Sequence, residues 1–172
     1  MNETQKLDMR LVRMSVVFLV TYGLLNLGYF LLPDGDLKKI HEWAILKPAA
    51  ATLNGLFGAS VSIIDNGLVS DGIYLAVVRG CDGAGVMFLL MAAITCFPTR
   101  VRFKVVGLLA GFLLVHGLNT CRIIVLYLVF RDRRELFADL HNLYIPTGML
   151  LVCSLAFLFW LQQAQGNRAQ PL

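Results

Sequence analysis

Four apolar runs, separated by polar and glycine-rich segments, dominate the hydropathy pattern of this chain. They cover residues 15–32, 83–97, 105–130 and 143–161. A helix of about 20 apolar residues crosses the hydrocarbon core of a bilayer, so runs of this kind are typical of transmembrane helices. The second run is a short span that ends at Pro98. We therefore predict a membrane all-α protein with about four transmembrane helices.

The first apolar run has a competing interpretation as a cleavable signal peptide. The run is long for the apolar region of a signal peptide, and no small-x-small cleavage site precedes Pro33. We interpret it as a retained first helix.

Residues 34–82, between the first two spans, have a mixed pattern that predicts a segment outside the membrane. Its first part favours a short amphipathic helix at the interface, with Trp43 at headgroup level. The apolar positions of this helix are Leu37, Ile40, Trp43 and Ala44. Pro48 favours a second short helix to about Phe57. An additional span over residues 48–64 remains open but is not favoured, because Asn54 and two glycines interrupt the run.

A small β-hairpin is expected between the short helices and the second span. Asp65-Asn66-Gly67 separates the apolar run that ends at Ile64 from a second β-rich run over 72–78. An Asn-Gly pair between apolar runs is a strong hairpin signal. The edges of a hairpin cannot be exposed to lipid, so we place it outside the bilayer.

Composition supports the membrane class and one domain. The chain has 172 residues, 58% of them apolar, and a mean hydropathy of +0.70, against about 45–50% apolar residues in soluble domains. This length suits a single integral membrane domain over residues 1–172, in contact with membrane lipid. The net charge is +4, but no basic face is interleaved with aromatic residues, so we expect no nucleic-acid partner.

The distribution of charge suggests an orientation. Lysine and arginine divide evenly between the two sides, so their number alone decides nothing. The short loop 98–104 contains three basic residues and no acid, whereas the segments on the other side contain acids. We therefore predict both termini in the cytoplasm of a bacterial inner membrane, with residues 34–82 and 131–142 facing the periplasm.

The stretch from Val78 to Gly85 carries the first candidate chemistry. A glycine-rich entry into a helix leaves backbone N–H groups that favour negative charge, which stabilises a thiolate such as that of Cys81. Arg79 and Asp82 add two charges, and Gly83 opens the apolar run. The alternative is a turn that merely contains a small buried cysteine.

The other cysteines show no CxxC spacing, so they form neither a disulfide framework nor a zinc framework. A disulfide between Cys81 and Cys121 stays a competing interpretation, because the bacterial periplasm is an oxidising compartment. Metal binding by Cys81, Cys121, His116 and His141 has no ligand spacing to support it, so we predict no metal.

Three polar residues approach the depth of Cys81 from other spans. Arg122 lies about 17 residues into the third span, roughly 25 Å along a helix, and therefore near the same surface as Cys81. An arginine there faces either the bundle interior or, by snorkelling, the headgroups. Asn119 lies on the same helix face and can hold the guanidinium or a substrate carbonyl. His141 is a candidate acid and base, or alternatively a plain loop histidine.

Taken together, these motifs resemble those of the exosortase/archaeosortase family of membrane cysteine transpeptidases. In that family a Cys followed shortly by Gly opens a span, an Asn-x-x-Arg pattern lies in a later span, and a His precedes the last span. Here they read Cys81-Asp82-Gly83, Asn119-Thr120-Cys121-Arg122, and His141 with Gly148 downstream. The resemblance covers about residues 55–160. Asp82 stands where the family usually has Ser, and the shortness of the chain is similar to the compact branch, exosortase H.

The resemblance implies a function. The substrate is expected to be a secreted protein that ends in a short motif, an apolar helix and a basic cluster. Cys81 would form a thioester with it, Arg122 and Asn119 would stabilise negative charge, and His141 would transfer protons. No metal or organic cofactor is implied, and the acceptor nucleophile (water, an amine or a glycolipid) stays open.

Two other functions compete with this one. In the first, the chain is a non-catalytic membrane subunit that binds lipid or a partner through Arg122 and His141. In the second, it is a small transporter or proton relay. A transporter needs a polar path to the cytoplasm, but Val105–Val115 contains no charged residue, which argues against it. An enzyme must need the sulfur of Cys81, whereas the other two functions tolerate alanine there.

Overall fold

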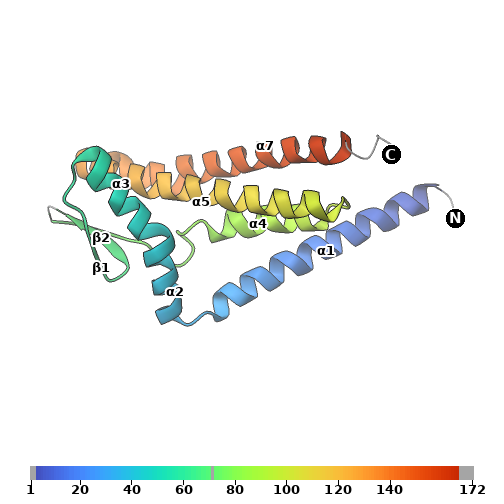
Figure 1. The fold of residues 1–172 in the computed structure, drawn as a ribbon, viewed down its shortest axis with the longest axis horizontal. Helices are drawn as coiled ribbons and strands as arrows, with labels where there is room; N and C mark the ends of the chain where they lie inside the picture. The colour runs from blue at the N-terminus through green and yellow to red at the C-terminus, as the bar shows by residue number, and fades with distance from the viewer. Residues whose placement is uncertain (1–2, 71, 167–172) are drawn as a thin grey trace. The chain divides into compact units, whose positions relative to one another are not determined.

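The computed structural model describes residues 3–70 and 72–166, which are mostly helical with one small antiparallel sheet (Figure 1). The elements, in chain order, are α1 (Glu3–Leu31), α2 (Asp34–His41), the π-helix η1 (Glu42–Leu46), α3 (Lys47–Phe57), β1 (Ser62–Ile64), β2 (Gly67–Ser70), β3 (Ile73–Ala76), α4 (Ala84–Cys96), α5 (Val101–Asp132), the 3-10 helix η2 (Arg134–Leu136), α6 (Phe137–Asp139), the π-helix η3 (Leu140–Tyr144) and α7 (Ile145–Gly166).

The chain divides into two compact units. We call the first the helical unit (Met1–Leu31, Gly85–Leu113 and Val152–Leu172) and the second the sheet unit (Leu32–Ala84 and Leu114–Leu151). This division does not test whether residues 1–172 form a single domain in a membrane. The single membrane domain therefore stays a prediction.

Among the residues that the structure describes, three helical segments are long and apolar enough to cross a membrane: Leu7–Leu31, Val101–Asp132 and Arg134–Gly166. They match the predicted first, third and fourth spans. The last segment has 33 residues, about 13 more than a bilayer requires, so its first turns, with His141, precede the predicted span 143–161. These helices are compatible with a membrane protein.

The predicted count of four spans is not confirmed, because α4 has only 13 residues. At 1.5 Å per residue such a helix is about 20 Å long, less than the ~30 Å core of a bilayer. Its ends have local causes: Gly83 has a positive φ of 80° just before the helix, and Pro98 follows closely after Cys96 and disfavours helical backbone at the preceding residue.

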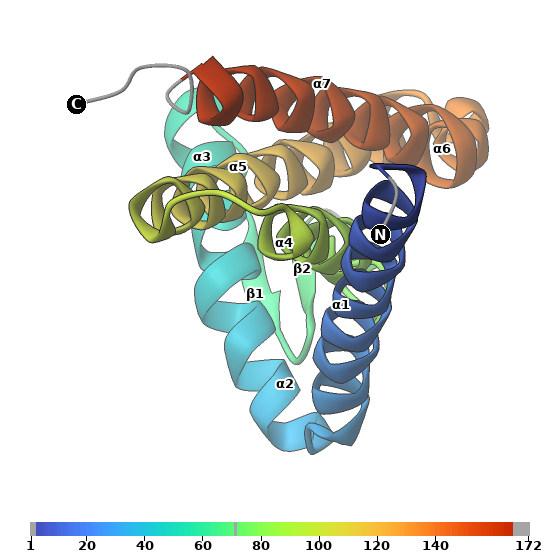
Figure 2. The same ribbon diagram turned by 90° about the vertical axis from the view of Figure 1, so that its right-hand side faces the viewer.

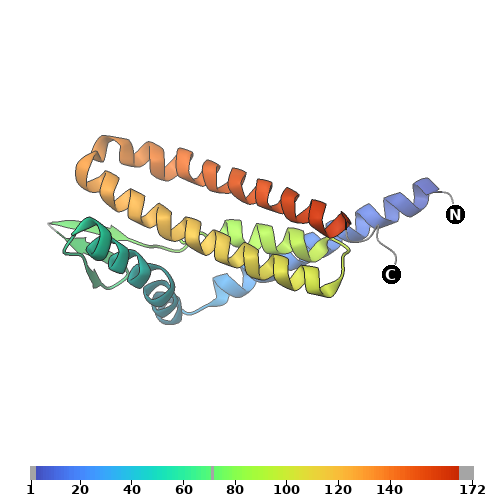
Figure 3. The same ribbon diagram turned by 45° about the horizontal axis from the view of Figure 1, so that its top comes forward.

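Within the helical unit, α4 and the first half of α5 lie side by side (Figure 3). Gly111 leaves room for Leu90 and Ile94 of α4. The indole nitrogen of Trp160 on α7 donates to the carbonyl of Phe103, at 3.0 Å. Large apolar side chains remain exposed along α1, whose most apolar window has no buried residue. Such a surface needs lipid or a partner to cover it.

In the sheet unit, α3, the three strands and the second half of α5 share one apolar core (Figures 1 and 2). Leu46, Leu53, Leu68 and Tyr127 are fully buried there. Pro48 stands at the start of α3, as predicted, and Gly58 ends the helix in the left-handed conformation. The core therefore combines the segment between the first two apolar runs with the end of the third run.

The predicted turn after Ile64 is present, but its strands belong to a three-stranded sheet in the order β1-β2-β3. Ile64 pairs with Gly67 across the predicted turn, where Asp65 has a positive φ of 54°. The expected pairing of the run that ends at Ile64 with the run over 72–78 is wrong, because β2 lies between them and pairs with both β1 and β3. Gly72 has a φ of 75° and permits the second reversal of the chain. The short strand β2 was hidden between the two turns.

The predicted amphipathic helix exists as α2 and η1, but its apolar positions divide. Leu37 is buried, together with His41, whereas Ile40 and Trp43 are exposed. The Lys47 ammonium lies 3.3 Å from the Trp43 ring centroid. The next buried residues are Ile45, four residues after His41, and Leu46, both in the π-helix η1. Location of this helix at a membrane interface stays a prediction.

Candidate active site

Cys81 lies in a tight turn, residues 78–83, which we call the thiol turn. The turn follows β3 directly and leads into α4. The backbone N–H of Cys81 donates to the carbonyl of Val78 at 3.0 Å. Gly80 and Gly83 have φ values of 87° and 80°, which favour glycine. The glycine-rich stretch found in the sequence therefore serves to bend the backbone around the half-buried thiol.

His141 contacts Cys81 although the two residues are 60 positions apart in the sequence. Its Nε2 atom lies 3.7 Å from the Cys81 sulfur. The imidazole stacks on Phe137, with 5.3 Å between ring centroids and an interplanar angle of 11°. The histidine belongs to the π-helix η3, and π-helical turns frequently mark functional sites. The predicted convergence of thiol and imidazole is therefore a direct contact in the structure.

The surroundings of His141 favour its neutral form. Burial first, and the positive charge of Arg122 second, lower the pKa of His141 below its ordinary value of 6.5. Within residues 3–70 and 72–166, its Nδ1 atom is buried without a hydrogen-bond partner. A neutral imidazole can accept the thiol proton, because one of its ring nitrogens is unprotonated.

Arg122 faces the thiol turn and does not snorkel. Its side chain is buried, and its Nη1 atom donates to the carbonyl oxygen of Cys81 at 3.3 Å. The Nε atom is also buried and has no hydrogen-bond partner among the described residues. A buried guanidinium that is only partly satisfied is poised to bind a further acceptor.

Asn119 packs against the thiol turn one helical turn before Arg122. A Cβ atom on Gly83 would lie 3.0 Å from the Asn119 side chain, so glycine is needed there for space as well as for its φ. In the described part of the chain, Oδ1 of Asn119 has no hydrogen-bond partner. A donor from Arg122 and an acceptor from Asn119 are thus both available beside Cys81.

His41 also contacts the thiol turn, although no sequence pattern had singled it out. Its Nε2 atom lies 2.8 Å from Oδ2 of Asp82, and the two side chains are 4% and 5% exposed. The other carboxylate oxygen of Asp82 accepts from the backbone N–H of Ala84 at 3.2 Å, where α4 begins. The signal that could have indicated His41 is its position four residues after Leu37, which places both on one helix face.

Arg79 lies in the thiol turn, but its side chain makes hydrogen bonds away from Cys81. Arg79, expected to support the site, binds Leu32 and Asp34 at the start of α2. All four cysteines are free, so the alternative of a disulfide between Cys81 and Cys121 is not what the structure contains. No group of three or more metal-ligating side chains is assembled among the described residues.

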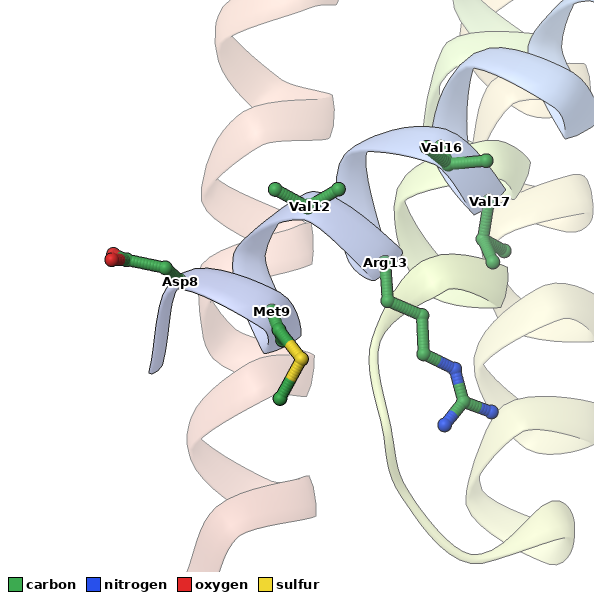
Figure 4. Close-up of a pocket in the computed structure, with 6 residues that line it drawn as sticks. All are labelled: Asp8, Met9, Val12, Arg13, Val16 and Val17. Carbon is green, nitrogen blue, oxygen red and sulfur yellow. The ribbon is translucent and has the colours of Figure 1, made fainter. Parts of the chain in front are cut away.

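One open pocket lies on the helical unit (Figure 4). Its six lining residues all belong to the first turns of α1: Asp8, Met9, Val12, Arg13, Val16 and Val17. It contains none of the residues of the candidate active site.

No family model, curated protein or solved structure matches this chain. The resemblance to the exosortase/archaeosortase family therefore rests on its three short motifs and stays a prediction.

Proposed function

We propose that this chain is a membrane-embedded cysteine protease or transpeptidase of the exosortase type. The contact between the sulfur of Cys81 and Nε2 of His141, at 3.7 Å, carries the proposal. A nucleophile within reach of a base is the arrangement that covalent acyl transfer requires. Arg122, buried and bound to the same cysteine, supplies positive charge where an oxyanion develops.

The first half of the reaction forms a thioester. The neutral imidazole of His141 takes the thiol proton as the Cys81 sulfur attacks a substrate carbonyl carbon. The new C–S bond gives a tetrahedral oxyanion, which accepts hydrogen bonds from the guanidinium of Arg122. The C–N bond then breaks, and the imidazolium gives its proton to the leaving amine.

The second half releases the product. A nucleophile, either water or an acceptor amine or hydroxyl group, loses a proton to His141 and attacks the thioester carbon. The C–S bond breaks, and the imidazolium of His141 returns its proton to the departing sulfur, which restores the Cys81 thiol and the neutral imidazole. Asn119 holds the substrate main chain through its unpartnered oxygen. The cycle needs no electron transfer, because each half exchanges one acyl bond for another.

The proposed substrate is a secreted protein whose C-terminal signal combines a short motif, an apolar helix and a basic end. The three long apolar helices support a location in the inner membrane, where such a signal helix is also held. We place the active site on the periplasmic side, because the loop 98–104 is basic and free of acids.

The proposal is tested by the mass of a co-expressed candidate substrate. Wild-type protein should shorten the substrate at its C-terminus, and Cys81→Ala should leave it intact. Cys81→Ser should fail almost as completely, because an alcohol is far less nucleophilic than a thiolate at neutral pH. Cys121→Ala is the matched control and should process normally. Full processing by Cys81→Ala would reject the enzyme and favour the non-catalytic membrane subunit.

A further inference from the structure

The buried pair of His41 and Asp82 has no part in the reaction described above. Both side chains are almost completely inaccessible, and 2.8 Å separates Nε2 from Oδ2. Burying a carboxylate is costly unless hydrogen bonds or a charge compensate it. A pair of this kind therefore constrains the backbone on both sides of it.

The pair reaches the nucleophile through one peptide unit. Asp82 follows Cys81 directly, and its second oxygen holds the first N–H of α4. The carbonyl of Cys81 is held from the other side by Arg122, and Gly83 rests on Asn119. His41 is thus the contribution of α2 to a turn whose other supports come from α5.

We propose that His41 is a positioning residue, which acts through Asp82 to keep the sulfur of Cys81 facing Nε2 of His141. The expected loss of substrate processing rests on the proposed function, whereas the expected change in the alkylation rate of Cys81 does not. Without His41 the carboxylate has lost a buried partner and must turn toward another donor. Asp82 then moves relative to Ala84, and the neighbouring sulfur moves with it.

The chain offers a graded set of variants for this proposal. Glutamine at position 41 presents an amide nitrogen at nearly the reach of Nε2, so His41→Gln keeps a donor for the carboxylate. His41→Leu keeps the bulk and removes the donor. Lys39→Leu changes an exposed residue of the same helix and serves as the control.

The primary measurement is the rate at which iodoacetamide alkylates Cys81 in the purified full-length protein. Peptide mass spectrometry separates Cys81 from the other three cysteines. We expect His41→Leu to lower this rate by about tenfold or more, because the sulfur loses its contact with the base, and His41→Gln and Lys39→Leu to stay within about threefold of wild type. A displacement near 1 Å costs on the order of 10²-fold in catalysis, so His41→Leu should lower kcat for substrate processing by that order with little change in KM.

A double variant distinguishes positioning through Asp82 from a general loss of stability. If His41 acts through Asp82, the fold-loss in alkylation rate of the double variant His41→Leu/Asp82→Asn should be much smaller than the product of the fold-losses of the two single variants. Multiplying effects, or a wild-type alkylation rate in His41→Leu, would overturn the proposal. So would a decrease in His41→Gln as large as that in His41→Leu. If the wild-type protein processes no substrate, the proposed function fails while the alkylation rates still decide the role of His41.

Discussion

The two units of this chain differ in where they place polar and apolar side chains. Among the described residues, the four buried polar or charged side chains, His41, Ser70, Asn119 and Arg122, all belong to the sheet unit. The apolar core formed by α3, the strands and the second half of α5 lies in the same unit. The helical unit instead exposes large apolar side chains along α1, such as Leu19 and Phe30.

This difference indicates which unit bears the cost of buried polar groups and which unit exposes apolar surface. Buried polar groups are costly unless partners are positioned for them, so they require a rigid surrounding core. The sheet unit provides that core together with the Cys81, Arg122 and His141 side chains. The exposed apolar surface of the helical unit is suited to lipid, which needs no specific packing partner. Chemistry and membrane anchoring are therefore expected to depend on different residues.

The largest difference between substitutions in the two units should be in the rate of substrate processing. His141→Ala removes the proton donor and acceptor, so we expect a loss on the order of 10²- to 10⁴-fold in the rate of substrate processing. Phe159→Ala, in the part of α7 that belongs to the helical unit and 65% exposed, should stay within about twofold, because it touches none of this machinery. Initial rates of C-terminal shortening measure both. Equal losses would show that the units do not divide the work as we describe.

Substitutions in the sheet unit should also lower the free energy of unfolding more than substitutions in the helical unit. Leu46→Ala empties a fully buried position in the core and should lower the free energy of unfolding by about 2–5 kcal/mol. Leu19→Ala, at a position 64% exposed on α1, should change it by no more than about 0.5 kcal/mol. Reversible unfolding in detergent micelles gives both values. A large cost at Leu19 would mean that α1 packs against protein in the native assembly.

A smaller effect is expected from acid, and it belongs to the sheet unit, which contains all three histidines. The pKa of His141 is lowered by burial and by Arg122, so the folded state binds fewer protons than the unfolded state once the pH falls below about 6.5. Stability should therefore decrease as the pH falls from the unfolded pKa to the folded pKa, and then level off.

The acid effect is measured by titrating His141 with NMR and by unfolding at several pH values. His141→Gln should remove this part of the pH dependence. Arg122→Gln should bring the pKa of His141 closer to 6.5. A folded pKa above 6.5 would contradict the described surroundings, because it would require an anionic partner for the imidazole.

Much of the fold follows from patterns that the sequence displays locally. Three long apolar helices, the start of α3 at Pro48 and the turn at Asp65 were predicted because run length, proline and Asn-Gly signals act within a few residues. The π-helical turns at Glu42–Leu46 and Leu140–Tyr144 were not predicted, since none of these local signals marks them. The strand β2 was too short to stand out between its two turns.

The candidate site was predictable in part for a different reason. Cys81, Arg122 and His141 are conspicuous because a thiol, a guanidinium and an imidazole stand out at the ends of apolar spans. His41 is not conspicuous: its partner lies 41 residues away, and its helix was interpreted from its apolar positions alone. Only the tertiary structure shows that the face shared with Leu37 is buried and that a histidine there meets Asp82.

The central claim is that Cys81 forms an acyl bond with the substrate. It is tested most directly by incubating the purified protein with a candidate substrate and mapping Cys81 by peptide mass spectrometry. Our account predicts an adduct on the Cys81 peptide with the mass of the retained substrate fragment less one water, removable by hydroxylamine. Substrate cleavage that proceeds without an adduct on Cys81, and continues in Cys81→Ala, would contradict the account.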